Sequence, residues 1–226
     1  MSKEVMSDKQ ILACVDHTLL KPFATWEDIV ALCDEAVAYN VASVCVPPTY
    51  VWRIGKKYGT SLVICTVVGF PLGYSSSSSK FAEVQQALSD GATEIDMVIN
   101  ISDAKNGEFG EITDEISTLK RVCGSNVLKV IIETCYLTEV EKISLCKCVT
   151  DAGADFIKTS TGFGTNGATM ADVLLFREHI GSGVKIKAAG GVRTREDMVA
   201  FIEAGCARIG TSSAVKILGG EKPAGY

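Results

Sequence analysis

Residues 153–162 read Gly153-Ala154-Asp155-Phe156-Ile157-Lys158-Thr159-Ser160-Thr161-Gly162, an apolar run that ends in a lysine, hydroxyl side chains and a glycine. The apolar part, Ala154 to Ile157, predicts a short buried strand with Lys158 at its carboxyl end. Because burial favours the uncharged form of an amine, a lysine in this position can become a nucleophile. The alternative is a lysine that extends from the end of a strand into solvent.

A second lysine occurs in a matching context. The run Val184-Lys185-Ile186-Lys187-Ala188-Ala189-Gly190-Gly191 places Lys187 at the end of another apolar strand, just before two glycines. A second cation close to Lys158 would favour its free amine further. Lys129, Lys158 and Lys187 are spaced 29 residues apart, about the length of one strand and one helix, which predicts that they lie on adjacent strands.

Similar apolar runs, rich in β-branched residues, recur along the whole chain and alternate with helical patterns. We identify eight of them, centred near Val15, Val44, 63–68, 94–99, 128–132, 156–157, 184–188 and 208–209. Threonines precede several of the intervening helices: Thr25 before 26–39, Thr49 before a short helix to Lys57, Thr138 before 139–152, Thr169 before a helix to about His179, and Thr194 before 195–204. The serines at 75–79 indicate a loop and the start of the next helix rather than a linker.

Eight alternating strands and helices predict an α/β fold, a (β/α)₈ TIM barrel that forms a single domain over residues 1–226. The length of 226 residues and the hydrophobic content of 47% suit one domain with a sizeable core. A doubly wound open sheet shares the alternation. That fold often carries dinucleotide-binding glycines after its first strand, whereas Asp16-His17-Thr18-Leu19-Leu20 stands there in this chain.

Composition argues against several classes of protein. The net charge is −5 and the basic residues are scattered, so no nucleic-acid partner is expected. No apolar run reaches the roughly 18 residues of a membrane span, and residues 1–10 carry no targeting pattern, so we expect no membrane contact. The nine cysteines contain no Cys-x-x-Cys motif and mostly lie in apolar runs, which favours a reducing cytoplasm. The two histidines are too few for a typical metal-dependent enzyme, so neither a metal nor a cofactor is expected.

Charged side chains also occur inside the apolar runs. Asp96 lies within the run Glu94 to Ile99, where an unpaired carboxylate would be costly, so the lysines of neighbouring strands are its candidate partners. A buried salt bridge without chemistry is the alternative. Cys45, at the end of another strand, has no assignable histidine base, and we expect it to line the pocket rather than to act as a nucleophile.

Glycine and hydroxyl residues follow the last three predicted strands, at 161–162, 190–191 and 210–213. Glycines let backbone N–H groups approach an anion, and Ser212 or Ser213 would begin a final helix whose positive end favours phosphate. TIM barrels often bind phosphate between the loops after strands seven and eight. These clusters therefore predict a phosphate site, although ordinary turns would also use glycine.

Taken together, these motifs resemble the deoxyribose-phosphate aldolase family over nearly the whole chain. The stretches that carry the resemblance are DHTLLKP at 16–22, TVVGFPLG at 66–73, EIDMVIN at 94–100, LKVIIET at 128–134, FIKTSTGFG at 156–164, KAAGGVRT at 187–194 and RIGTSS at 208–213. Two departures from the family pattern, the serine run at 75–79 and Val46-Pro47-Pro48, concern loop geometry rather than chemistry.

The resemblance implies a lyase that reversibly cleaves 2-deoxy-D-ribose 5-phosphate into acetaldehyde and D-glyceraldehyde 3-phosphate through a lysine Schiff base, in deoxyribonucleotide catabolism and without a metal. It implies Lys158 as the Schiff-base lysine, with Lys187 and Asp96 holding a water that moves protons. The positions expected to contact the substrate or its phosphate are Asp16, Thr18, Cys45, Lys129, Thr159, Gly162, Gly190, Gly191, Ser212 and Ser213.

The chain ends in Tyr226, after a Gly-rich tail at about 219–226 whose composition is typical of a flexible end. The resemblance implies that this tyrosine folds over the active face and assists proton transfer at the enamine carbon; a frayed terminus is the alternative. Two other functions stay open: another sugar-phosphate barrel enzyme, such as an epimerase or a different Schiff-base aldolase, and a phosphosugar sensor without turnover. Self-association into a homodimer or a larger homo-oligomer also stays open.

Overall fold

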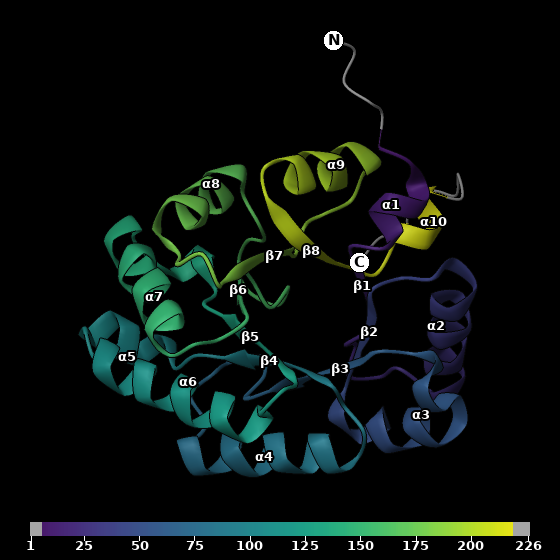
Figure 1. Ribbon diagram of the computed structural model, residues 1–226, viewed down its shortest axis with the longest axis horizontal. Helices are drawn as coiled ribbons and strands as arrows, with labels where there is room; N and C mark the ends of the chain where they lie inside the picture. Colours follow the sequence, from purple (N-terminus) through teal and green to yellow (C-terminus); the bar gives the residue numbers. More distant parts are fainter. Residues whose placement is uncertain (1–5, 219–226) are drawn as a thin grey trace.

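The computed structural model describes residues 6–218, and within them parallel strands form a closed barrel in which each strand pairs with the next and the last pairs with the first. Helices surround the strands on all sides (Figure 1). The predicted TIM barrel is confirmed. The strands are β1 (Val15–Thr18), β2 (Ser43–Val46), β3 (Ile64–Val68), β4 (Glu94–Val98), β5 (Val127–Ile131), β6 (Phe156–Lys158), β7 (Lys185–Ala189) and β8 (Cys206–Thr211).

The helices mostly follow the strands in alternation, as the sequence predicts. They are α1 (Asp8–Leu12), α2 (Trp26–Tyr39), α3 (Val51–Tyr58), α4 (Ser77–Ser89), α5 (Ile101–Asn106), α6 (Phe109–Cys123), α7 (Glu139–Asp151), α8 (Met170–His179), α9 (Arg195–Glu203) and α10 (Ala214–Leu218). Short 3₁₀ turns are η1 (Pro48–Tyr50), η2 (Gly59–Ser61) and η3 (Thr134–Tyr136). None of the helices within residues 6–218 combines the length and the apolar character needed to cross a membrane.

Threonine caps begin four of these helices as predicted. The Thr25, Thr138 and Thr194 side chains each accept a bond from the backbone N–H three residues on, and the acidic residue there bonds back to the cap. Thr169 accepts from the Asp172 N–H in the same way. The prediction for Thr49 is wrong. Thr49 lies inside η1, because the proline before it favours the first position of a helical turn, and α3 begins only at Val51.

The serine run at 75–79 starts a helix rather than linking two domains. The Ser76 side chain accepts a hydrogen bond from the Ser79 N–H at 3.3 Å, and α4 begins at Ser77. The interpretation of this stretch as a loop and a helix start is therefore confirmed.

Side chains on the strands alternate between two environments, because successive residues of a strand point to opposite faces. In β4, Ile95 and Met97 belong to the apolar core between strands and helices, whereas Asp96 points into the barrel and meets lysines. A smaller apolar cluster of Cys45, Cys65 and Val67 lies inside the barrel. The main hydrophobic core is thus the outer layer, and the barrel interior is left for charged groups.

Candidate functional site

A cavity of about 540 Å³ lies at the carboxyl ends of β1, β6, β7 and β8, the active face of a TIM barrel. Arg193, which we had not singled out from the sequence, also lines it; the signal was a cation directly after the glycines at 190 and 191. We call this space the active-face cavity. Seven of the predicted site residues line it: Thr18, Lys158, Gly162, Gly190, Gly191, Ser212 and Ser213.

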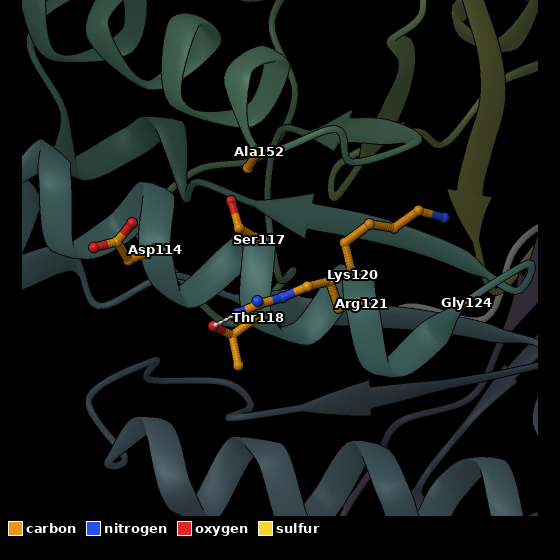
Figure 2. A pocket seen from close by; sticks show the side chains of 7 residues that line it. All are labelled: Asp114, Ser117, Thr118, Lys120, Arg121, Gly124 and Ala152. Carbon is orange, nitrogen blue, oxygen red and sulfur yellow. Dashed lines mark hydrogen bonds between the residues drawn. The ribbon is translucent and has the colours of Figure 1, made fainter.

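A larger hollow of about 730 Å³ lies along α6, and Figure 2 shows the side chains around it. Gly124 and Ala152 directly follow the ends of α6 and α7, so this hollow extends toward the amino-terminal ends of the strands. Its lysine, Lys120, is paired with Asp155 at 2.7 Å and with the Asn126 carbonyl at 3.0 Å. None of the predicted site residues lines this hollow, and we assign it no role in the chemistry.

Asp96 joins the two lysines that the sequence singled out. The Asp96 Oδ2 atom lies 2.7 Å from Lys158 Nζ and 2.7 Å from Lys187 Nζ, and all three side chains are buried. Of the three, only Lys158 lines the active-face cavity. The geometry therefore presents one amine to a ligand and keeps a second amine and a carboxylate directly behind it.

Strand register explains this arrangement. Lys158 and Lys187 are direct partners in the β6–β7 pair, so their side chains point to the same side of the sheet at the same level. The predicted position of Lys187 at the end of its strand is wrong, since β7 continues to Ala189 and leaves Lys187 in its middle. In this central position its ammonium is fully buried.

Lys129 occupies the third strand, as the spacing predicts, but at a lower level. Its register partner in β6 is Phe156, two residues before Lys158. Its Nζ atom lies 2.9 Å from Asp96 Oδ1 and 2.6 Å from Glu94 Oε2, and its side chain is fully buried. Lys129 thus supports the carboxylate from below and does not line the cavity.

Asp16 is the second buried carboxylate beneath the cavity. Its Oδ2 atom lies 2.5 Å from Lys187 Nζ and 3.6 Å from Lys129 Nζ. Thr18, two residues on, donates its hydroxyl to the Asp16 carbonyl at 2.7 Å and lines the cavity. Asp16 therefore contacts Lys187, a predicted catalytic residue, and does not line the active-face cavity.

These contacts set the protonation of the buried groups. Burial alone would lower the pKa of Lys187, but the carboxylates of Asp16 and Asp96 outweigh it and raise that pKa above its ordinary value. Burial would likewise raise the pKa of Asp96, yet Lys129, Lys158 and Lys187 hold it well below its usual range. Lys187 is therefore held as an ammonium and Asp96 as a carboxylate at neutral pH.

Two thiols complete the interior on the opposite strands. Cys45 and Cys65 are register partners in the β2–β3 pair, and both are fully buried. The Cys65 thiol lies 3.2 Å from Asp96 Oδ1, and its hydrogen bond to Cys45 lowers the pKa of Cys45 despite burial. Within residues 6–218, Cys45, Cys65 and Asp96 form a group whose ligand atoms lie within 4.8 Å of one another. The Asp96 carboxylate of this group is already paired with three lysines.

Thr159 is the predicted contact residue that the fold turns away from the cavity. Its hydroxyl is fully buried, donates to the Ala189 carbonyl at 3.2 Å and accepts from the Ala189 N–H at 3.1 Å. Because Lys158 points inward, the next residue must point outward. Thr159 thus joins two strands. Tyr226 and the tail from residue 219 lie outside the described residues.

Glu133 is a residue beside the site, just after β5, to which sequence reasoning gave no role. Its carboxylate accepts from the Thr161 hydroxyl and N–H, which anchors the loop after Lys158. It is buried, and its backbone adopts the left-handed region at φ 54°, which is uncommon for a glutamate. Burial raises the pKa of Glu133 above its ordinary value. Such a backbone conformation cannot be read from the sequence.

Comparison with known proteins gives consistent results. The model of a family described as DeoC/LacD family aldolase matches residues 10–217. A protein from Clostridium botulinum (strain Alaska E43 / Type E3) named deoxyribose-phosphate aldolase is 63% identical over 221 residues, which cover 98% of this chain and 100% of that protein.

Solved structures of deoxyribose-phosphate aldolases are also similar to this chain. The crystal structure of a putative deoxyribose-phosphate aldolase from Coccidioides immitis is similar with a TM-score of 0.91 and 37% identity, covering 96% of this chain and 87% of that one. A deoxyribose phosphate aldolase from Aeropyrum pernix, described as having a unique tetrameric structure, has a TM-score of 0.88 and 34% identity, covering 94% of this chain and 91% of that one.

Proposed function

Since the chain belongs to the DeoC/LacD family of aldolases, we propose that it reversibly cleaves 2-deoxy-D-ribose 5-phosphate into acetaldehyde and D-glyceraldehyde 3-phosphate. The observation that carries this proposal is the position of Lys158, which lines the active-face cavity while Asp96 and Lys187 lie directly behind it. A buried lysine next to a second cation and a carboxylate suits Schiff-base chemistry with a carbonyl substrate.

In the proposed reaction, the Lys158 amine attacks the C1 aldehyde of the open-chain sugar and water leaves to form an iminium. A base removes the proton of the C3 hydroxyl, and its oxygen becomes the carbonyl oxygen of D-glyceraldehyde 3-phosphate as the C2–C3 bond breaks and this aldehyde leaves. The electron pair of the broken bond moves into the iminium and forms an enamine. Protonation at C2 and hydrolysis then release acetaldehyde and the free lysine. Lys187 and Asp96, held in opposite charge states 2.7 Å apart, suit a water-mediated proton relay for these steps.

Lys158 suits the nucleophile better than its neighbours do. Lys187 bridges Asp16 and Asp96, and Lys129 bridges Glu94 and Asp96, so each of these ammonium groups has two carboxylates within 3 Å. Among the described residues, Lys158 has one close carboxylate, that of Asp96, and shares it with both of them. Its proton is therefore the one whose loss disturbs the fewest ion pairs.

The remaining predicted residues take supporting roles in this proposal. Thr18 is close enough to the cavity to contact a bound sugar, whereas Asp16, Lys129 and Cys45 shape the charged floor beneath it. Thr159 acts through the fold, by tying β6 to β7.

The phosphate is proposed to bind among the loops after β6, β7 and β8. Gly162, Gly190 and Gly191 line this part of the cavity with φ values of 87°, 80° and 76°, a region that glycine adopts without strain. Ser212 and Ser213 line it as well and add hydroxyl groups. Backbone amides and hydroxyls of this kind suit an anion.

We expect Ser212→Asp and Ser213→Asp to raise KM for deoxyribose 5-phosphate by about 10-fold or more, because each carboxylate would repel the phosphate. Unphosphorylated deoxyribose should be a poor substrate of the unchanged protein, and the two variants should affect its use little. Steady-state kinetics with both sugars measures this. Ser117→Asp, which adds the same charge to the hollow along α6, is the matched control. Equal use of both sugars by the unchanged protein would contradict the phosphate site.

A coupled assay for glyceraldehyde 3-phosphate release, run with a chelator present, tests the proposed function. Release together with acetaldehyde, and a borohydride-reduced adduct on Lys158, are the expected results. Tight binding of the sugar phosphate with neither adduct nor acetaldehyde would indicate a sensor instead. An epimerised sugar without cleavage would indicate an epimerase.

We further propose that the protein works in a reducing cytoplasm as a homo-oligomer. All nine cysteines are free, which supports the compartment. The Aeropyrum pernix protein described as tetrameric supports self-association. Light scattering of the purified protein would measure the assembly, and a monomer at micromolar concentration would contradict it.

A further inference from the structure

Two charged residues deeper in the barrel, Glu94 and Arg208, belong to neither the cavity nor the predicted site. The Arg208 guanidinium contacts both Glu94 oxygens, at 2.8 and 3.1 Å, and lies 2.5 Å from Asp16 Oδ1. The Glu94 carboxylate also lies 2.6 Å from Lys129 Nζ. Glu94 is 5% exposed and Arg208 18%. Buried ions of this kind are costly unless each is paired, so their partners decide what they do.

These contacts close a ring. From Asp96, ion pairs lead to Lys129, Glu94, Arg208, Asp16, Lys187 and back to Asp96, with every neighbouring pair of opposite sign. We call these six residues the charge ring. It contains three cations and three carboxylates, so it is neutral by itself. Within residues 6–218, Lys158 attaches to the ring through Asp96 alone and is the charge that the ring does not balance.

We propose that Glu94 and Arg208 are positioning residues that keep the charge ring neutral and thereby set how readily Lys158 gives up its proton. This inference rests on the proposed Schiff-base function. Neither residue contacts the cavity, so neither touches the substrate. They act through Asp16 and Lys129, which in turn hold Lys187 and Asp96. In a buried site, removing one charge from a neutral set leaves a net field that acts on the remaining titratable group.

Charged or thiol groups from every other strand of the barrel surround Lys158. They are Asp16 on β1, Cys45 on β2, Cys65 on β3, Glu94 and Asp96 on β4, Lys129 on β5 with Glu133 just after it, Lys187 on β7 and Arg208 on β8. Of these, Glu94 and Arg208 can be changed without altering a direct contact of Lys158 or of Asp96. Variants at these two positions therefore test how the net charge of the ring affects Lys158, with little change in the contacts of the reacting groups.

The proposal predicts opposite effects for the two single variants. Glu94→Gln removes a carboxylate and leaves an excess cation, which disfavours the Lys158 ammonium. Arg208→Met removes a cation and leaves an excess carboxylate, which favours it. We expect the acid limb of the pH dependence of kcat/KM to move down in Glu94→Gln and up in Arg208→Met, each by on the order of 0.5 to 1 pH unit. The pH dependence of the borohydride trapping rate should move in the same way.

The double variant is the decisive measurement. Glu94→Gln with Arg208→Met removes one charge of each sign, so the ring stays neutral and the acid limb should return to within about 0.3 pH unit of the unchanged protein. Arg208→Lys keeps the charge but loses the forked contact to Glu94, and it should leave the acid limb in place. If Arg208→Met does not fold, the other three variants still decide the question.

Glu115→Gln is the matched control, because Glu115 and Lys80 form a buried pair at 2.8 Å on the outer side of the barrel. It should lower stability without moving the acid limb. Single variants that shift the acid limb in the same direction, or that leave it in place, would overturn the inference. A purely structural role predicts lower activity or stability in both variants, without opposite shifts of the acid limb. An unchanged protein that neither cleaves the sugar nor forms an adduct would instead overturn the proposed function.

Discussion

Replacing Lys158 with alanine is expected to lower kcat by a factor on the order of 10⁴ to 10⁶, because none of the other lysines within residues 6–218 lines the cavity and could form the iminium. Borohydride treatment in the presence of deoxyribose 5-phosphate should leave the variant unmodified, whereas the unchanged protein should gain a reduced adduct on the peptide that contains Lys158. Peptide mass mapping measures this.

Two further variants separate the nucleophile from its charge. Lys158→Arg keeps a cation beside Asp96 but offers no amine, and it should be as inactive as the alanine variant. Lys147→Ala, on the exposed face of α7, should retain full activity. An adduct on Lys187 or Lys129 in the unchanged protein would show that the nucleophile has been assigned to the wrong lysine.

Asp96→Asn is expected to lower both activity and stability. Asp96 holds three lysines, so the amide would leave buried ammonium groups short of a carboxylate, at a cost of about 3–5 kcal/mol in the free energy of unfolding. Activity should fall about 10²- to 10⁴-fold through loss of the proton relay. Chemical denaturation and steady-state kinetics measure the two effects. Asp151→Asn, in an exposed pair with Lys147, is the control and should change neither.

Asp96→Asn should also change how the free energy of unfolding depends on pH in the acid range. The pKa values of Asp96 and Asp16 are both below their ordinary range in the folded protein, in spite of burial, because of the surrounding cations. Carboxyls with a depressed folded pKa contribute stability above their unfolded pKa of about 3.9 and lose it as the pH falls through the folded value. The unchanged protein should therefore lose stability below about pH 4, and Asp96→Asn should lose less over that interval. An identical dependence of the free energy of unfolding on pH in both proteins would contradict the ion pairing.

Much of the fold was predictable because it depends on local patterns. Apolar runs separated by capped helices predict the barrel, and the spacing of 29 residues correctly predicts adjacent strands for three lysines. Spacing along the chain does not reveal the stagger between strands, however. Lys129 therefore proved to lie one level below Lys158, a difference that separates a supporting residue from the proposed nucleophile.

Other parts of the site depend on contacts across the barrel. Glu94 and Arg208 are 114 residues apart, and no local pattern pairs them. A signal was present all the same, because each is a charged residue inside an apolar run. Strict alternation could also have shown that Thr159 points away from Lys158. The anchoring of the loop after β6 by Glu133 depends on a left-handed backbone conformation that glutamate rarely adopts.

The interior charges also divide the barrel into two halves of opposite sign. The carboxylates Asp16, Glu94 and Asp96 come from β1 and β4, whereas Lys129, Lys158, Lys187 and Arg208 come from β5 to β8. A fragment that contains only the first four strands would hold these three carboxylates without the cations that pair with them, and the complementary fragment would hold these four cations without their carboxylates. Each half thus supplies the counterions of the other. The ion pairs between the two halves therefore favour the closed barrel over either half alone.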